Sequence, residues 1–422
     1  MADNGYNNEL GVNESDSLSE TVVVIREYDR KTDRERVEQV ENSCEVGPNG
    51  ELSLYTDLLG DPICRVRNSP AYLMLVAETV KNAGDGDEKR EIVGMIRGCI
   101  KTVTCGSKFS RSKTGDPAKP LPVYTKLAYI LGLRVSPFHR RMGIGLKLVR
   151  RMEQWFGDNG AEYSYIATDD ANEPSVSLFT GKCGYSKFRN PSVLVHPVFA
   201  HRLPVSNRVT VIKLSPVDGE TIYRHRFSTI EFFPRDIDAV LNNHLNLGSF
   251  LAVPKGYIWG GSDKFISDPP ENWAIMSVWN CKDVFKLEVK GASKLRKGFA
   301  KTTRILDRVF PFLRLPSLPK IFSPFGLHML YGLGGSGPLY TRYAKALFGF
   351  AHNLAKECKC GVVATEVSSE DPLRLAIPHW KILSFTDLWC IKRLGEDYSD
   401  GSVGDWRKSQ PGLSVFVDPR EF

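Results

Sequence analysis

Residues Leu127–Gly145, which read LAYILGLRVSPFHRRMGIG, decide the fold of this chain. The near-continuous apolar run Leu127–Val135 is typical of a strand that is buried on both faces of a sheet. The segment Arg140–Gly145 then leads into Leu146–Phe156, whose apolar residues recur at helical spacing, and a further strand pattern follows at Tyr163–Thr168. This order predicts an α/β fold in which a helix begins at the carboxyl end of a central strand, where anions bind.

The glycines of this turn suit it to an anion such as a pyrophosphate. Gly143 and Gly145 carry no side chain, so a ligand can approach consecutive backbone N–H groups closely. Positive charge nearby comes from Arg140, Arg141, Lys147, Arg150 and Arg151. An Arg-x-x-Gly-x-Gly pattern often arises by chance, but here it follows a strong strand, opens an amphipathic helix and lies downstream of Val135-x-Pro137. The context therefore predicts a phosphate-binding turn.

These residues resemble a known signature. Val135-x-Pro137, Arg140-x-x-Gly143-x-Gly145 and the downstream Asn172, Leu178-Phe179 and Gly184-Tyr185 resemble the acetyl-CoA signature of the GNAT superfamily of N-acetyltransferases. The resemblance covers Thr21–Ser186 in the order of strands and helices, and the runs Cys44–Cys64 and Ile92–Gly106 resemble the plant Hookless-type N-acetyltransferases. It implies a GNAT acyl-CoA N-acyltransferase fold, an α/β (α+β) mixed central sheet flanked by helices. It also implies acetyl-CoA as cosubstrate, transfer to an amine, and a role in plant differential growth.

The resemblance also implies which residues contact acetyl-CoA. The backbone amides of Arg141–Gly145 would bind the pyrophosphate, the strand end at Leu133 and Val135 would pair with the pantetheine arm, and Asn172 would contact that arm from the other side. The expected cofactor-binding residues are Leu133, Val135, Arg140, Arg141, Met142, Gly143, Ile144, Gly145, Asn172 and Phe179. Asn172 also suits an ordinary cap of the helix predicted at Pro174–Lys182, and both roles are compatible.

Catalysis is less well specified by the sequence. Acetyl transfer requires that the amine lose its proton and that the leaving thiolate gain one. The family often has a Glu where this chain has Tyr129, and a Tyr general acid where it has Phe179. The candidate catalytic residues are Tyr129, Asp169, Asp170 and Glu78, with Asp57 as a further carboxylate. Asp169 and Asp170 suit a turn cap equally well, and Tyr129 also suits a core strand.

Length and composition predict a folded chain of two domains, because a single core rarely exceeds roughly 300 residues. The chain has 422 residues, of which 42% are hydrophobic and 25% charged. Residues 1–20 hold five acidic and no basic residues, which predicts a disordered acidic tail. We expect an intracellular protein, nuclear or cytoplasmic, with no membrane span and no metal, because nine scattered cysteines follow a start without an export signal.

The second half repeats the order of the first. A strand pattern at Phe325–Tyr331 precedes the glycine-rich Gly332–Gly337, a helical pattern at Leu339–Cys358 and a strand pattern at Val362–Val367. This predicts a second, degenerate GNAT-like domain over 201–422 behind the acetyltransferase domain at 21–200. Because the turn lacks the Arg-x-x-Gly-x-Gly pattern, we expect this domain to bind no cofactor and to shape the acceptor groove.

The leading hypothesis is an acetyl-CoA-dependent N-acetyltransferase that acts on the amine of a protein or peptide. A protein acceptor is favoured by the polar, 17-residue segment Gly106–Pro122, which predicts an exposed loop, and by the basic helix predicted at Gly291–Phe312. A small-molecule amine acceptor is an alternative. So is a catalytically weak, acetyl-CoA-binding regulatory pseudoenzyme, favoured by Tyr129 and Phe179. The basic stretch Gly291–Lys320 leaves nucleic-acid binding open, although such a stretch also suits a solvated helix face.

Overall fold

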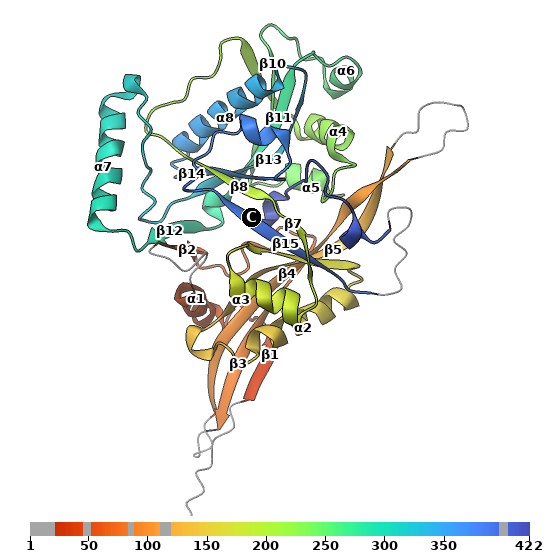
Figure 1. The fold of residues 1–422 in the computed structure, drawn as a ribbon, viewed down its shortest axis with the longest axis vertical. Helices are drawn as coiled ribbons and strands as arrows, with labels where there is room; N and C mark the ends of the chain where they lie inside the picture. The colour runs from red at the N-terminus through yellow and green to blue at the C-terminus, as the bar shows by residue number, and fades with distance from the viewer. Residues whose placement is uncertain (1–21, 45–51, 83–87, 110–119, 396–403) are drawn as a thin grey trace, which may run out of the picture.

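The structure is a computed structural model that describes residues 22–44, 52–82, 88–109, 120–395 and 404–422. Within these ranges one 13-stranded mixed sheet runs through the molecule, and a second sheet pairs only two strands. Figure 1 shows two lobes along the long axis, with helices on both faces of the sheet. The predicted acidic tail at 1–20 lies outside the described residues.

The elements of the first half are β1 (Val22–Glu27), α1 (Arg34–Ser43), β2 (Ser53–Asp57), β3 (Ala71–Asn82), β4 (Glu88–Phe109), β5 (Pro120–Val135), α2 (Ile144–Asp158), β6 (Tyr163–Asp169), α3 (Glu173–Val176), β7 (Ser186–Arg189) and β8 (Ser192–Pro197). A short π-helix, Ser177–Lys182, continues α3. The elements of the second half are β9 (Val209–Leu214), α4 (Pro216–Phe227), α5 (Ile237–Leu241), β10 (Asn246–Pro254), α6 (Ser262–Ser267), β11 (Trp273–Asn280), β12 (Lys286–Lys290), α7 (Lys294–Val309), β13 (Leu327–Ser336), α8 (Tyr340–Glu357), β14 (Val362–Val367) and β15 (Phe385–Arg393).

The strand order of the large sheet is β1-β3-β4-β5-β6-β15-β8-β14-β13-β11-β10-β9, with β7 paired to β15. The parallel pairs among the described strands are β5–β6 and β13–β14, and each is joined through one long helix, α2 or α8. Each half therefore contains one strand–helix–strand unit whose two strands are parallel neighbours in the sheet. The mixed central sheet flanked by helices, predicted from the sequence, is confirmed.

The two halves exchange their last strands. Strand β15, from the end of the chain, pairs along its length with β6 of the first half, from Asp387↔Asp169 to Arg393↔Tyr163. Strand β8 instead pairs with β14 of the second half, from Val362↔Pro197 to Val367↔Ser192. Figure 1 shows β15 in blue beside the yellow strands of the lower lobe. The sheet is thus continuous across residue 200, and the domain boundary placed there stays a prediction.

Apolar packing holds α2 and α1 on opposite faces of the first half. The buried face of α2 consists of Ile144, Leu148, Val149, Met152 and Phe156, as its helical spacing predicts. It shares one apolar core with β3, β4, β5 and β6, whereas α1 packs Val37 and Val40 into a separate core against β3 and β4. In the second half α8 covers β10, β11, β13 and β14 in the same way. A large aromatic core lies between the two halves.

Two local expectations need correction. Gly106–Phe109 and Pro120–Pro122 continue the hairpin strands β4 and β5, so the exposed loop expected over Gly106–Pro122 is shorter at both ends. Residues 110–119 lie outside the described part of the chain. The segment Gly332–Ser336 is not a turn but the end of β13, because glycine there accommodates a β-bulge opposite β11. In the described residues, no helix has the length and apolar character that crossing a membrane requires.

Candidate functional site

The central strands β5 and β6 diverge at the carboxyl end of their pairing. Four parallel pairs hold them together, from Leu127↔Tyr163 to Ile130↔Ile166. Beyond that point the register of β5 on β4 shifts at Gly132, whose φ is +63°. A β-carbon at Gly132 would clash with the guanidinium of buried Arg97. The glycine bulge therefore bends β5 away from β6, while β6 continues its pairing on β15.

The glycine-rich turn opens helix α2 beside this divergence. Arg141 and Gly143 both have left-handed backbone conformations, with φ of +64° and +75°. Gly143 is the N-cap residue, and the first turn of the helix is closed by the N–H of Lys147, which donates to the carbonyl of Gly143 at 3.0 Å. In the described structure no backbone carbonyl accepts from the amides of residues 141–146. These amides and the positive end of the helix dipole thus face a common space.

The expected cofactor residues of β5 meet those of the glycine-rich turn here. A β-carbon at Gly145 would lie 3.5 Å from Leu178, 3.8 Å from Val135 and 3.9 Å from Leu133, whereas one at Gly143 would meet nothing within 4 Å. The end of β5, the start of α2 and the π-helix after α3 therefore converge. Arg140, Arg141 and Met142 are exposed, and Ile144 is buried in the core of α2.

Asn172 and Phe179 follow β6 along the chain, Asn172 at the start of α3 and Phe179 in the π-helix behind it. The side chain of Asn172 caps α3, because its Oδ1 accepts the N–H of Ser175 at 3.3 Å. Phe179 is 3% exposed and packs edge-on against Tyr185, with ring centroids 5.3 Å apart. Asn172 thus fulfils its capping role, and Phe179 presents little side-chain surface to a ligand.

Tyr129 lies on the face of the sheet opposite α2, at the last pairs before the strands diverge. Its ring stacks on that of Tyr165 with centroids 4.5 Å apart, and burial raises the pKa of both phenols well above the usual value. The hydroxyl of Tyr165 donates to Oε2 of Glu421 at 2.6 Å. Lys101 in turn donates to the same carboxylate and pairs with Asp418. A segment near residue 420 thus supplies a carboxylate beside Tyr129.

Three aspartates gather where β6 ends and β15 begins. Asp169 lies opposite Asp387 in the antiparallel register, and Asp170 follows it. Burial, followed by the charges of Asp169 and Asp170, raises the pKa of Asp387 to about 7. Oδ1 of Asp169 accepts the N–H of Ala171 at 2.9 Å, so this carboxylate also caps the turn.

Glu366 of β14 completes the acidic group. It is buried, its Oε1 accepts the indole N–H of Trp389 at 3.0 Å, and burial together with Asp387 raises its pKa well above the usual value. Carboxyls whose pKa values are raised by burial are suited to accept and release protons near neutral pH.

Glu78 lies apart from the other candidates, in β3, two strands from β5. Its carboxylate contacts Arg26 at 3.2 Å, Arg36 at 3.1 Å and Arg90 at 3.5 Å. Although burial opposes ionisation, the hydrogen bonds and charge of Arg26 and Arg36 lower the pKa of Glu78. The structure therefore presents Glu78 as a structural anion, not as a member of the group at the divergence.

Sequence reasoning missed Asp387, Glu366 and Glu421. Each lies more than 190 residues from Asp169 along the chain, and strand exchange or the chain end brings it to the site. Asp387 and Glu366 share one detectable signal, a charged residue within a strand pattern, at Phe385–Arg393 and at Val362–Val367. No sequence motif around this signal specifies a functional carboxylate.

In the described part of the second half, the equivalent helix start at α8 is not open. The N–H of Leu339, at the start of α8, already donates to Oδ1 of Asn272 at 2.6 Å, and a β-carbon at Gly337 would clash with the carbonyl of Glu271. A small hollow lies where β13 and β14 diverge, and the segment Ser414–Val417 lines it. Phe416 of that segment packs on Tyr331, with ring centroids 6.3 Å apart.

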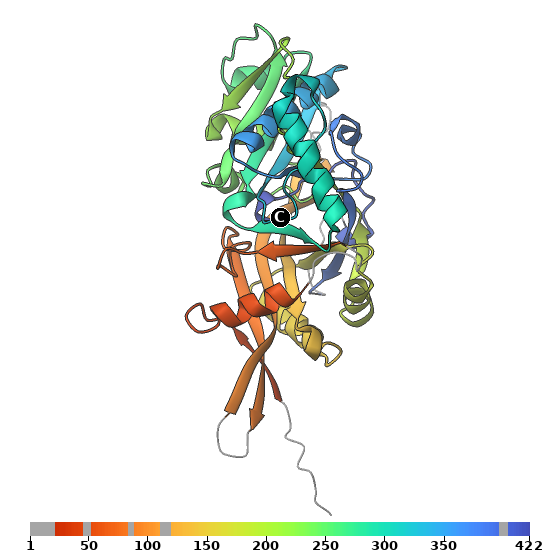
Figure 2. The same ribbon diagram turned by 90° about the vertical axis from the view of Figure 1, so that its left-hand side faces the viewer.

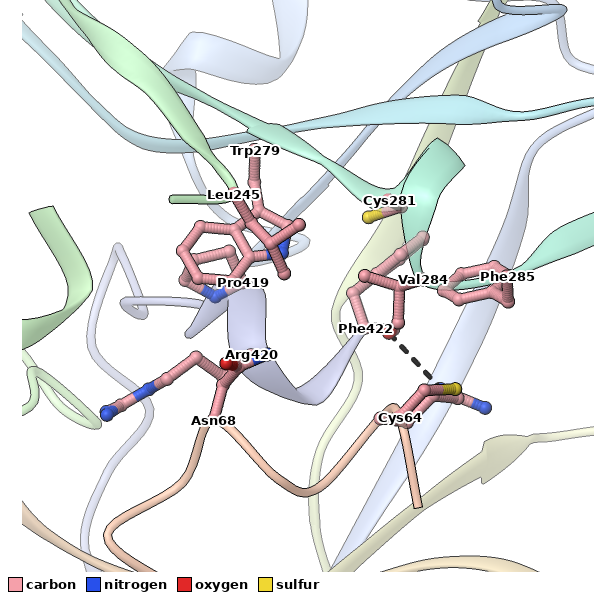
Figure 3. A pocket seen from close by; sticks show the side chains of 11 residues that line it. Cys64, Asn68, Leu245, Trp279, Cys281, Val284, Phe285, Pro419, Arg420 and Phe422 are labelled. Atoms are coloured by element: carbon pink, nitrogen blue, oxygen red, sulfur yellow. Dashed lines mark hydrogen bonds between the residues drawn. The ribbon is translucent and has the colours of Figure 1, made fainter. Parts of the chain in front are cut away.

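A smaller hollow lies at the junction of the halves, away from the glycine-rich turn (Figure 3). Cys64, Cys281 and Phe422 are among its lining residues, and Nε of Arg65 donates to the carbonyl of Phe422 at 3.3 Å. Burial raises the pKa of the Cys64 thiol to about 11 and that of the Cys281 thiol to about 12. Neither thiol is therefore activated as a nucleophile.

Comparisons with known proteins identify relatives of this chain. The model of the acetyltransferase (GNAT) family matches residues 53–185. The probable N-acetyltransferase HLS1 of Arabidopsis thaliana is 66% identical over 409 residues, which cover 95% of this chain and 100% of that protein. The acetyl transferase GW6a of Oryza sativa subsp. japonica is 38% identical over 447 residues, covering 97% and 100%. The solved structure of Saccharomyces cerevisiae N-myristoyltransferase with bound myristoyl-CoA is 12% identical, with a TM-score of 0.49, and covers 88% of this chain and 79% of that one.

Proposed function

The chain belongs to the GNAT family of acetyltransferases, and from this membership we propose that it transfers the acetyl group of acetyl-CoA to an amine of a protein or peptide. The single observation that carries the proposal is the divergence of β5 from β6 beside a helix start whose amides have no backbone acceptor in the described structure. A diverging strand edge and a row of free amides together suit an elongated ligand that ends in phosphates.

The residues of the turn fit a pyrophosphate. Gly143 leaves open space above the amides, and Arg140, Arg141 and Lys147 are exposed around them. No acidic residue stands in the first turn of α2, so the helix dipole is not neutralised there. The backbone edge of β5 at Leu133 and Val135 would hold the pantetheine arm, with Asn172 across from it. When bound, acetyl-CoA supplies the activated acetyl group.

We propose Asp387 as the base that takes the proton of the amine. A lysine amine, with a reference pKa near ~10.4, is mostly protonated at neutral pH, so the base must accept protons in that range. The raised pKa of Asp387, about 7, meets this demand, and its position opposite Asp169 lies next to the divergence of β5 and β6. Tyr129, Tyr165 and Glu421 form a hydrogen-bonded and stacked group on the same face, suited to orient groups at the site.

We propose that residues 201–422 form the second GNAT-like domain and take part in acceptor binding without binding cofactor. The repeated strand–helix–strand unit, the capped start of α8 and the segment at Ser414–Val417 support this division. The same half contributes β15, and with it Asp387, to the first. An intracellular location, nuclear or cytoplasmic, is supported by nine cysteines that are all free thiols. A role in plant differential growth rests on the Hookless-type resemblance.

A second candidate function is a regulatory protein that binds acetyl-CoA without turnover. The burial of Tyr129 and Phe179, which stand where the family often has its Glu base and Tyr acid, favours it. The two functions share one cofactor site and differ only in catalysis, so binding and turnover must be measured separately.

Calorimetric titration with acetyl-CoA tests the cofactor site. We expect binding by the wild type and loss of binding in Gly143→Asp, whose carboxylate would repel the pyrophosphate. Gly256→Asp is a matched control, because Gly256 also has positive φ and open space around its β-carbon but lies in the second half. Absence of binding by the wild type would overturn both candidate functions.

Release of CoA in the presence of a library of lysine and N-terminal peptides then tests turnover. Acetylated peptides identified by mass spectrometry are expected for the acetyltransferase. Intact binding without CoA release, for peptides and for a panel of small amines alike, would favour the regulatory function.

A further inference from the structure

Helix α7 is attached to the body of the protein by polar contacts. Asp307 is fully buried; its Oδ1 lies 2.6 Å from Nδ1 of His201, and its Oδ2 accepts the N–H of Ala200 at 2.7 Å. Arg304, one turn earlier, donates to the carbonyl of Val198, and Ala300 is buried in the same row. The side of α7 that faces the protein is thus a row of small and polar residues.

The apolar residues of α7 face away from that row. At 3.6 residues per turn, Leu295, Phe299, Leu306 and Val309 share one side of the helix, and they are 86%, 64%, 42% and 59% exposed. Ile305 lies beside them and is 52% exposed. A surface helix normally turns such a row toward the core, so this orientation is the reverse of the usual one. Figure 2 shows α7 on the outside of the upper lobe.

A basic row borders the apolar row. Lys294, Lys297, Lys301 and Arg308 are all exposed, and the sole acidic residue of the helix is the buried Asp307. The apolar row continues past the helix end into exposed Phe310, Phe312, Leu313 and Leu315. We call the apolar row and the basic row together the α7 surface. It comprises the exposed sides of helix Lys294–Val309 and excludes the buried side.

We propose that the α7 surface binds an acidic, amphipathic helical segment of a partner protein. The basic row requires a negatively charged partner, and the adjoining apolar row requires apolar side chains from the same partner. Such a segment would carry apolar residues at helical spacing and acidic residues along one flank. A helix of 16 residues is about 24 Å long, so a segment of about four turns matches it.

Other anionic partners fit these observations less well. Nucleic acid would engage the basic row and leave the apolar row in water. A lipid surface would be matched best by an uninterrupted apolar face of Trp, Phe and Leu, as helices that lie in the membrane interface have. Gly298 and Thr302 also interrupt the apolar row with small side chains, and no atom lies within 4 Å of a β-carbon at Gly298. This notch suits an inserted partner side chain better than a flat lipid surface.

A library of 20-residue peptides displayed on phage, panned on the full-length protein, tests the proposal. We expect selected peptides to have net negative charge and apolar residues at helical spacing. Their affinity should fall at least tenfold in Phe299→Glu and in Leu306→Glu, and should weaken with added salt. Leu375→Glu is the matched control, because Leu375 is 88% exposed but lies elsewhere. All these side chains are exposed, so the fold should be retained, as circular dichroism can verify.

A charge exchange makes the test specific. In Lys301→Glu/Arg308→Glu, binding of the selected acidic peptide should be lost and binding of its Lys-substituted version should appear. Selection of no acidic amphipathic peptide, or selection unaffected by the α7 variants, would overturn the proposal. Co-sedimentation with phosphatidylcholine–phosphatidylserine vesicles, or binding to a DNA duplex, that depends on Phe299 and Leu306 would also overturn it.

Discussion

Asp387 of β15 lies directly opposite Asp169 of β6 in an antiparallel pair, at the edge where β6 parts from β5. The Cβ atoms of directly opposite residues are about 5 Å apart, so two negative charges there repel each other. Burial first, and then the charges of Asp169 and Asp170, raises the pKa of Asp387 to about 7. One strand contributed by the second half thus sets the acid–base properties of the first.

A pH–rate profile tests Asp387 as the base. Because the base must be deprotonated to accept a proton, kcat/KM of the wild type should rise with pH through about 7 and then level off. Asp387→Asn should lose this rise and lower kcat/KM by about 10²- to 10⁴-fold, the usual contribution of a general base. Asp169→Asn should shift the rise to lower pH, since it removes a charge that raises the pKa of Asp387. A normal rise in Asp387→Asn would refute this role.

Gly132 in the bulge of β5 and Gly332 in the bulge of β13 are a matched pair of sites for substitution. Their φ values are +63° and +60°, and a β-carbon would clash with Arg97 in one case and with Tyr223 in the other. Both Gly→Ala variants should lose about 3 kcal/mol of unfolding free energy, from backbone strain and overpacking. Gly132→Ala alone should also weaken acetyl-CoA binding, because only β5 borders the glycine-rich turn.

Urea unfolding and calorimetry of the two variants measure both effects. Gly157→Ala in α2 is the control, since Gly157 has space around its β-carbon and should gain stability from helix propensity. Equal loss of acetyl-CoA affinity in Gly132→Ala and Gly332→Ala would contradict the assignment of the cofactor to the first half.

Buried histidines predict a loss of stability at acidic pH. His328 is fully buried, neither ring nitrogen has a partner in the described structure, and burial lowers its pKa from 6.5 to about 4. In the unfolded chain it binds a proton near pH 6.5, so stability is complete above that pH and falls as the pH drops toward 4. The shift corresponds to about 3 kcal/mol. His352, whose pKa burial lowers to about 3, adds to the same loss.

Urea midpoints between pH 8 and pH 4.5 check this dependence. His328→Phe should unfold at an equal or higher urea concentration than the wild type at pH 8, because an apolar ring replaces two unpaired nitrogens. Its midpoint should fall less on acidification. If wild type and variant lose stability in parallel, His328 is not a source of the acid sensitivity.

The sequence predicts most of what local periodicity controls. The helical spacing of Leu146–Phe156 and the apolar run Leu127–Val135 gave α2 and the end of β5, and the glycines between them predicted the turn. The exchange of β8 and β15 has no local signal, because the apolar pattern of a strand does not specify in which half its pairing partner lies. Asp387 and Glu421 reach the site only through such long-range placement. Gly332–Ser336 was misread because glycine favours a bulge in a strand as well as a turn.

The buried hydrogen bond between Asp307 and His201 should control the order of α7. Burial opposes ionisation of Asp307, but hydrogen bonds from Ser317, His201 and the amide of Ala200 lower its pKa below the usual value. Its contribution to stability is therefore present above about pH 4 and is lost as the pH falls further. Asp307→Asn removes the charge at neutral pH and should cost about 2 kcal/mol. Amide hydrogen exchange should then accelerate across Lys294–Val309 and leave α2 unchanged. Unaltered exchange in α7 would mean that other contacts hold this helix against the protein.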